Sequence, residues 1–175
     1  MANTYELLSS NTLSSSASSV TFSSIPQTYT DLVLRMSTRD ATNGATYGSA
    51  LITINGSSAS VYSYQRLLLT GPSTVSSTAV SGGNSSFSIS PIGNGSTAPT
   101  NSFGFCEIYI ANYKSTSTVY LSTTSFASGG TSVVSPTLTN GSWGGAAAIT
   151  SITIASNGGT FATASSFNLY GINNS

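Results

Sequence analysis

Charged residues are scarce in this chain of 175 residues, which has four cations and four anions. In an ordinary globular domain about 25 % of residues are charged. The charges also cancel, so the chain lacks the basic field that binds nucleic-acid phosphates, and we expect no nucleic-acid partner. The charged residues are Arg35, Arg39, Arg66, Lys114, Glu6, Asp31, Asp40 and Glu107.

Histidine is absent, and Cys106 is the single cysteine. Ser-His-Asp and Cys-His catalysis need an imidazole base, and zinc sites built from His and Cys need more ligands than this chain has. Calcium sites of the EF-hand type need clustered acidic side chains, and the sequence contains no such run. We therefore expect no metal, no cofactor and no disulfide within the chain.

The four carboxylates are poorly spaced for acid–base catalysis. A glycosidase holds two carboxyl groups about 5–9.5 Å apart. Asp31 and Asp40 fall near opposite ends of one expected strand, about 30 Å apart at the usual rise per residue. We expect surface ion pairs instead, for example between Asp31 and Arg35, and a protein that is not an enzyme.

Long apolar runs are missing as well. No stretch of about 18 apolar residues occurs, so no transmembrane helix and no membrane partner are expected. Residues 1–8 show neither a positively charged segment nor a long apolar stretch, so we expect no secretory signal and folding in a cytoplasm.

The chain is rich in hydroxyl groups, with 38 Ser and 25 Thr, and in the alternation typical of β-strands. In residues 29–39, Leu32, Leu34 and Met36 fall on one face, and Asp31 and Arg35 fall on the other. The same period recurs in residues 50–54, 105–110, 119–121, 152–154 and 167–169. We expect one all-β domain over residues 1–175, an antiparallel β-sandwich of jelly-roll type.

Turn signals accompany these strands. Asn-Gly, which favours type I′ hairpin turns, occurs five times, beginning at residues 43, 55, 94, 140 and 157. One expected hairpin pairs residues 152–155 with 160–163, and a second pairs 52–54 with 60–64. Residues 71–83 and 91–100 are rich in Ser, Thr, Gly and Pro and are expected to be long loops, either contact loops or disordered excursions.

Aromatic residues supply the candidate contact site. Trp143 lies between glycines that can present its indole outwards, although a core position is an equal alternative. Tyr62, Tyr64 and Arg66 share one face of an expected strand and are further contact candidates, with a core role as the stronger alternative for the two tyrosines.

The small number of charges also bears on assembly. Soluble monomers commonly protect their sheet edges with Lys, Glu or Pro, and this chain has few of them. We expect neighbouring subunits to cover the edges, although Ser and Thr hydroxyls offer another way to keep the strands in solution.

Several phrases resemble small virion proteins of tailed bacteriophages, especially marine and cyanobacterial ones. They are MANTYELL at residues 1–8, IPQTYTDLVL at 25–34, ITINGS at 52–57, FGFCEIYIANYK at 103–114 and FNLYGINNS at 167–175. The likeness spans nearly the whole chain, with a less matched middle at about residues 71–100. These are strand phrases, and the resemblance implies a β-rich virion component without catalytic residues.

The resemblance implies a non-enzymatic structural protein, assembled in the host cytoplasm and located in the virion. As the first expectation, it decorates or cements a capsid as a homo-oligomer in contact with the major capsid protein. The alternative is a tail fibre or receptor-binding module that contacts tail components and binds a host surface glycan.

Overall fold

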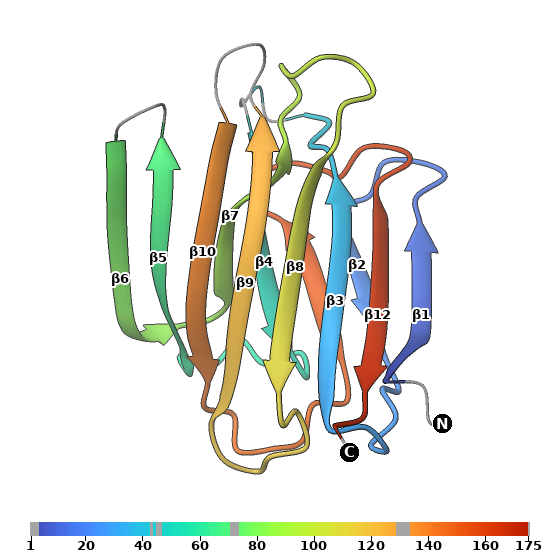
Figure 1. Cartoon of the computed structure of the whole chain (residues 1–175), viewed down its shortest axis with the longest axis vertical. Helices are drawn as coiled ribbons and strands as arrows, with labels where there is room; N and C mark the ends of the chain where they lie inside the picture. Colours follow the sequence, from blue (N-terminus) through green and yellow to red (C-terminus); the bar gives the residue numbers. More distant parts are fainter. Residues whose placement is uncertain (1–3, 43, 45–46, 71–73, 129–133, 175) are drawn as a thin grey trace.

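The computed structural model describes residues 4–42, 44, 47–70, 74–128 and 134–174, which form twelve strands and no helix (Figure 1). The all-β prediction is confirmed. The strands are β1 (Tyr5–Thr12), β2 (Ser19–Phe22), β3 (Asp31–Thr38), β4 (Tyr47–Ile54), β5 (Tyr62–Thr70), β6 (Thr74–Asn84), β7 (Phe87–Asn94), β8 (Gly104–Ala111), β9 (Val119–Ser128), β10 (Val134–Trp143), β11 (Ile152–Ser156) and β12 (Ser166–Ile172).

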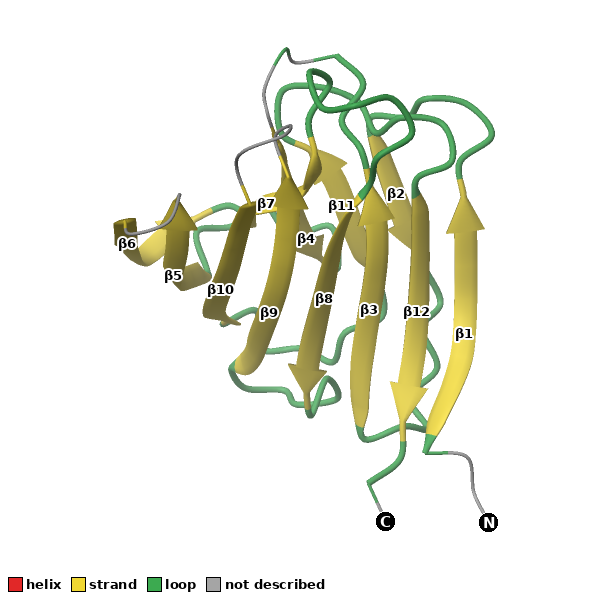
Figure 2. Ribbon diagram, turned by 45° about the horizontal axis from the view of Figure 1, so that its top comes forward, coloured by secondary structure: helices red, strands yellow, loops and turns green. Residues whose placement is uncertain are grey.

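Two antiparallel sheets pack face to face as a sandwich (Figure 2). The larger sheet has eight strands in the order β1-β12-β3-β8-β9-β10-β5-β6, and the smaller has four in the order β2-β11-β4-β7. From β2 to β8 the chain changes sheet at most connections, with β2, β4 and β7 in the smaller sheet. Strands that follow one another in the chain therefore often lie in different layers.

The core lies between the two layers and consists of the apolar faces that alternation predicted. Leu32, Leu34 and Met36 of β3 are at most 1 % exposed, and the inward-facing apolar residues of β4 and β8 are equally buried; these are Ala50, Ile52, Ile54, Cys106, Ile108 and Ile110. Cys106 belongs to this core, where burial raises the pKa of its thiol far above the usual range. The sulfur is therefore a protonated, apolar contact rather than a nucleophile.

The two predicted hairpins are wrong. The turn at Asn55-Gly56 has the positive φ angles expected of it, 52° and 64°, but it leads from β4 in the smaller sheet to β5 in the larger one. Strand β11 pairs with β2 and β4, and Phe161 makes only isolated bridges, to Ala17 and Asp40. The sequence identified the turn chemistry correctly, but strand pairing depends on which layer each strand joins.

Other Asn-Gly pairs differ from the expectation too. Asn140-Gly141 lies inside β10, where it pairs with both neighbouring strands, so it is not a turn. Asn94 ends β7, and Gly158 follows β11 with a positive φ of 87°. Asn43 lies outside the described residues.

The two predicted long loops are largely wrong as well. Residues 71–73 lie outside the described part, and residues 74–83 belong to the edge strand β6. Strand β7 continues through Asn94, so of the second predicted loop only residues 95–100 lie in the connection to β8, which begins at Gly104. Alternating Ser, Thr, Ala and Val can form a strand as readily as a loop when a neighbouring strand supplies backbone hydrogen bonds.

Candidate binding surface

Trp143 lies in the core, not on the surface. Its side chain is 1 % exposed, and at the end of β10 it pairs with Tyr62 of β5 and Val119 of β9. The chain then closes over the indole, because a Cβ at Gly145 would lie 2.0 Å from Trp143 Cζ2. The prediction of an exposed contact residue is wrong here: the glycines let the backbone cover the ring.

Tyr62 is also buried, so the structure shows the core role that was the stronger alternative for this residue, and the contact role is wrong. Its hydroxyl accepts a hydrogen bond from the Ile54 N–H at 2.8 Å and donates one to the Ser57 carbonyl at 3.2 Å. Burial raises the pKa of Tyr62. The residue ties β5 to the end of β4, across the two sheets.

Tyr64 and Arg66 share the inner face of β5 with Tyr62, as the alternation indicated, and both are half-buried. The Tyr64 ring meets Phe87 of β7 edge-on at 5.8 Å, and the Arg66 guanidinium lies 5.7 Å from the Tyr64 ring centre. Arg66 also donates to the Ser88 carbonyl at 3.0 Å, and burial lowers its pKa. These contacts fasten β5 to the smaller sheet.

The outer face of the eight-stranded sheet carries every large hydrophobic side chain that is exposed in the described residues. The exposed fractions run from 37 % for Tyr109 to 67 % for Tyr120. Such concentration on one face is unusual, because exposed apolar residues normally scatter over a surface. The set is Tyr5, Leu7, Leu67, Leu69, Val75, Phe105, Tyr109, Tyr120, Phe126 and Leu138.

Six of these side chains form an apolar band near one end of the sheet: Leu67, Leu69, Val75, Phe105, Phe126 and Leu138. Cross-strand pairing places Leu69 opposite Val75, Leu67 opposite Leu138, and Phe105 opposite Phe126. Residues directly opposite on one face lie about 4.5–5.5 Å apart at Cβ. Between β10 and β9, Leu138 is opposite Thr124 and diagonal to Phe126, about 7–8 Å away and within reach of an aromatic ring, so the band runs across β6, β5, β10, β9 and β8.

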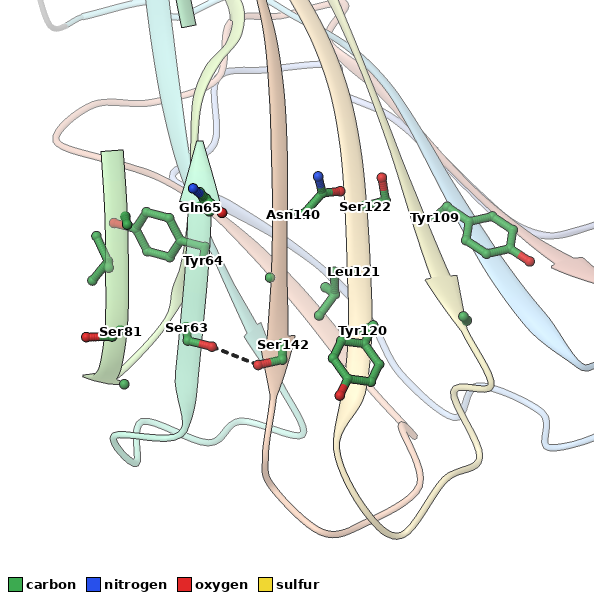
Figure 3. Close-up of a pocket in the computed structure, with 15 residues that line it drawn as sticks. Ser63, Tyr64, Gln65, Ser81, Tyr109, Tyr120, Leu121, Ser122, Asn140 and Ser142 are labelled. Carbon is green, nitrogen blue, oxygen red and sulfur yellow. Dashed lines mark hydrogen bonds between the residues drawn. The ribbon is translucent and has the colours of Figure 1, made fainter. Parts of the chain in front are cut away.

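An open groove of about 640 Å³ lies beside the band on the same face (Figure 3). Gln65, Asn140 and Ser122 form a row across β5, β10 and β9, and a second row contains Ser63, Ser142 and Tyr120. None of the described residues that line it is charged. The groove is therefore an uncharged and mainly apolar surface, with amides and hydroxyls in two rows across it and aromatic residues at the β8–β9 side.

Some polar side chains of the groove are hydrogen-bonded to each other, and others are available to a ligand. The hydroxyls of Ser63 and Ser142 bond to each other at 2.7 Å (Figure 3). The amides of Gln65 and Asn140 lie directly opposite one another, and within the described residues neither has a hydrogen-bond partner. Each amide offers two donor hydrogens and an acceptor oxygen to a ligand.

The ion pair predicted between Asp31 and Arg35 is wrong. Arg35 pairs with Glu107 across β3 and β8, with Nε 2.7 Å from Oε2, and its guanidinium lies 5.6 Å from the ring centres of Tyr5 and Tyr170. The bond to Glu107 raises the pKa of Arg35. Because both partners are well exposed, the pair adds little stability.

Asp31 is instead buried at the start of β3, with 5 % exposed. Its carboxylate accepts hydrogen bonds from the Asn112 N–H at 2.7 Å, from the Tyr109 hydroxyl and from the Asn174 amide. The bond to Asp31 raises the pKa of Tyr109. The cluster joins β3, β8 and the end of the described chain.

Asp40 follows β3 and therefore lies at the opposite end of this strand from Asp31. It is also buried, and its carboxylate accepts a hydrogen bond from the Thr42 N–H at 2.9 Å. Asp40 also accepts a hydrogen bond from the Ser156 hydroxyl at 3.4 Å, so both aspartates join segments of the fold that are distant in the chain. Among the described residues no three or more His, Cys, Asp or Glu side chains gather in a metal-binding group. Among the described residues, the outer face of the large sheet carries both the exposed apolar side chains and the groove, and it is the candidate binding surface.

Sequence reasoning missed the groove residues Gln65, Asn140, Tyr109 and Tyr120. The available signal was the phase of alternation, because Tyr109 and Tyr120 fall out of phase with the buried Ile108 and Val119. That signal predicts exposure, but the fact that these residues share one groove follows from the strand order β5-β10-β9-β8.

Two further findings concern membrane-spanning helices and similarity to known proteins. In the described part of the chain no helix is long and apolar enough to span a bilayer. Comparisons with family models, with curated proteins and with solved structures find no match to this chain.

Proposed function

We propose that this protein is a non-enzymatic structural component of a phage particle that decorates the capsid by docking its apolar band on a neighbouring virion protein. One observation carries the proposal: all the exposed large hydrophobic side chains of the described residues lie on the outer face of one sheet. The virion setting rests on the resemblance of the strand phrases.

The band has the chemistry of a protein-docking surface. Its six side chains are 39–61 % exposed, contiguous and uncharged, and the ion pair of Arg35 and Glu107 lies at its border. Covering half-exposed Leu, Val and Phe side chains contributes about 0.5–1 kcal/mol each. Six such contributions suit attachment to the apolar surface of another protein, with the charged pair at the rim.

The topology supports the same proposal. If the hairpin of β9 and β10 is set aside, the smaller sheet has the order β2-β11-β4-β7, and the larger sheet has the order β3-β8-β5-β6 beyond β1 and β12. This order supports an eight-stranded jelly roll, and jelly rolls are common among viral capsid proteins and lectins. We infer that the chain is a jelly roll with one inserted hairpin and with β1 and β12 added at the β3 side.

The first test is attachment to the particle. Phe126→Glu combined with Leu138→Glu is expected to lower the number of copies per purified virion at least about 10-fold, because two carboxylates would be buried unpaired in the interface. Cryo-electron microscopy and quantitative mass spectrometry of virions would measure occupancy and position.

Ser19→Glu, on the smaller sheet, is the matched control, since Ser19 is an exposed strand residue away from the band. Its occupancy is expected to equal that of the parent. Parental occupancy of the double variant would contradict docking through the band, and a few copies at the tail would replace decoration by the tail alternative.

A second candidate function is binding of a neutral glycan in the groove. The unpartnered, adjacent amides of Gln65 and Asn140 favour it, because paired amides suit the vicinal hydroxyls of a sugar ring and Tyr120 offers an exposed aromatic face. The contact site is thus proposed at Gln65, Asn140 and Tyr120 in place of Trp143.

We expect a neutral oligosaccharide to bind with a Kd of roughly millimolar, and Asn140→Ala to weaken binding about 10-fold, the cost of a lost hydrogen-bonding group. Titration by NMR would measure both. Thr124→Ala, on the same face but outside the groove, should leave the affinity unchanged. Absence of binding by all neutral oligosaccharides at millimolar concentration would exclude this candidate.

A further inference from the structure

Strand β6 is an unprotected sheet edge. It lies last in the order of the large sheet, and in the described structure it pairs with β5 alone. Its residues 74–79 are all exposed, so neither face of this stretch is covered by the smaller sheet. Figures 1 and 2 show β6 at the end of the large sheet, beyond β7.

The other three edges carry features that oppose strand addition. β1 has Glu6 and an irregular register between Leu7 and Ser9, β2 has only four residues, and β7 contains Pro91. Residues 74–80 of β6 have no charge, no proline and an uninterrupted register with β5. A long, neutral edge of this kind is a template for another strand.

The sequence of this edge is close to palindromic. In an antiparallel pairing centred on Ser77, Val75 faces Ala79 of a second copy, Ser76 faces Thr78, and Ser77 faces itself. Apolar groups then meet apolar groups on the outer face, where pairing with Leu69 and Gln65 places Val75 and Ala79. On the inner face Ser76 meets Thr78 and, at each end, Thr74 meets Val80, and no like charges are brought together.

We propose that two copies of this chain associate through antiparallel pairing of residues 74–80 of β6 about a two-fold axis at Ser77. The interface is isologous, so each favourable pair occurs twice. The two large sheets become one continuous sheet, and both apolar bands face the same side of the dimer. Gly82 and Gly83, with φ of 52° and 83°, bend the strand away and limit the pairing to this stretch. This dimer does not depend on the proposed function.

Analytical ultracentrifugation of the full chain is expected to show a dimer with a Kd of roughly micromolar to sub-millimolar, since the interface is small. Ser77→Lys places two ammonium groups opposite each other at the axis and should raise Kd at least about 10-fold. Thr124→Lys, on the same sheet face but in the interior of the sheet, should leave it unchanged. A chain that stays monomeric into the millimolar range overturns the proposal.

Cross-linking tests the register. Val75→Cys and Ala79→Cys proteins, mixed and treated with a short bis-maleimide, should cross-link more than about 10-fold faster than either protein alone. The native Cys106 is fully buried and does not interfere. Equal cross-linking of Val75→Cys alone, or a dimer that survives Ser77→Lys, would overturn pairing at β6.

Discussion

Replacement of Trp143 by alanine is expected to lower the free energy of unfolding by about 3–5 kcal/mol, the usual cost of a deleted buried Trp or Phe. The indole is 1 % exposed, packs between Tyr62 and Val119, and is covered by Gly145. Small domains are stable by only about 5–15 kcal/mol, so the loss is a large fraction of the total. Urea unfolding followed by circular dichroism would measure it.

Tyr120→Ala is the matched control, because Tyr120 is an aromatic residue of the neighbouring strand that is 67 % exposed. It should change stability by less than about 1 kcal/mol. Trp143→Phe should fall between the two, since Trp143 Nε1 has no hydrogen-bond partner in the described structure and its loss costs only volume. Equal stabilities of Trp143→Ala and Tyr120→Ala would contradict the buried position.

Asp31→Ala is expected to cost about 2–4 kcal/mol, because it removes the acceptor of three donors in a nearly buried cluster. The Asn112 N–H and the Tyr109 hydroxyl lose their common partner, and the chain end near Asn174 loses its contact with β3. Hydrogen exchange is expected to accelerate at Asn112 and Asn174 in particular.

The same cluster predicts a pH dependence. The bond to Asp31 raises the pKa of Tyr109 above the ordinary tyrosine value of 10.0, so the stabilising effect of this bond is present below that pH and is lost as the pH rises through the raised pKa. Asp31→Asn keeps the size of the side chain but removes the charge, so the pKa of Tyr109 should move back down. Difference absorbance between each protein and its Tyr109→Phe variant would report the tyrosinate, and an unchanged pKa in Asp31→Asn would contradict the assigned cause.

The strands were predictable wherever one face is strongly apolar. Leu32, Leu34 and Met36, or Ile52 and Ile54, leave one orientation in which the chain can bury them, and the structure adopts it. Residues 74–83 were not predictable, because Ser, Thr, Ala and Gly carry little preference and a neighbouring strand decides their state. The hairpins failed for a related reason: a turn dipeptide such as Asn55-Gly56 specifies a bend but not the sheet that the next strand joins.

For the candidate site too, some features could be predicted from the sequence and others could not. The composition, rich in hydroxyls and poor in charge, and the alternation were enough to predict an antiparallel sandwich. The alternation could be recognised in the sequence because it depends only on neighbours along one strand. Whether Trp143 points in or out depended on how Gly145 closes over it, and the groove of Gln65, Asn140 and Tyr120 exists only because β5, β10 and β9 lie side by side. Local pattern decides which face of a strand is buried, and long-range packing decides which residues meet, because the contacts join segments that are distant in the chain.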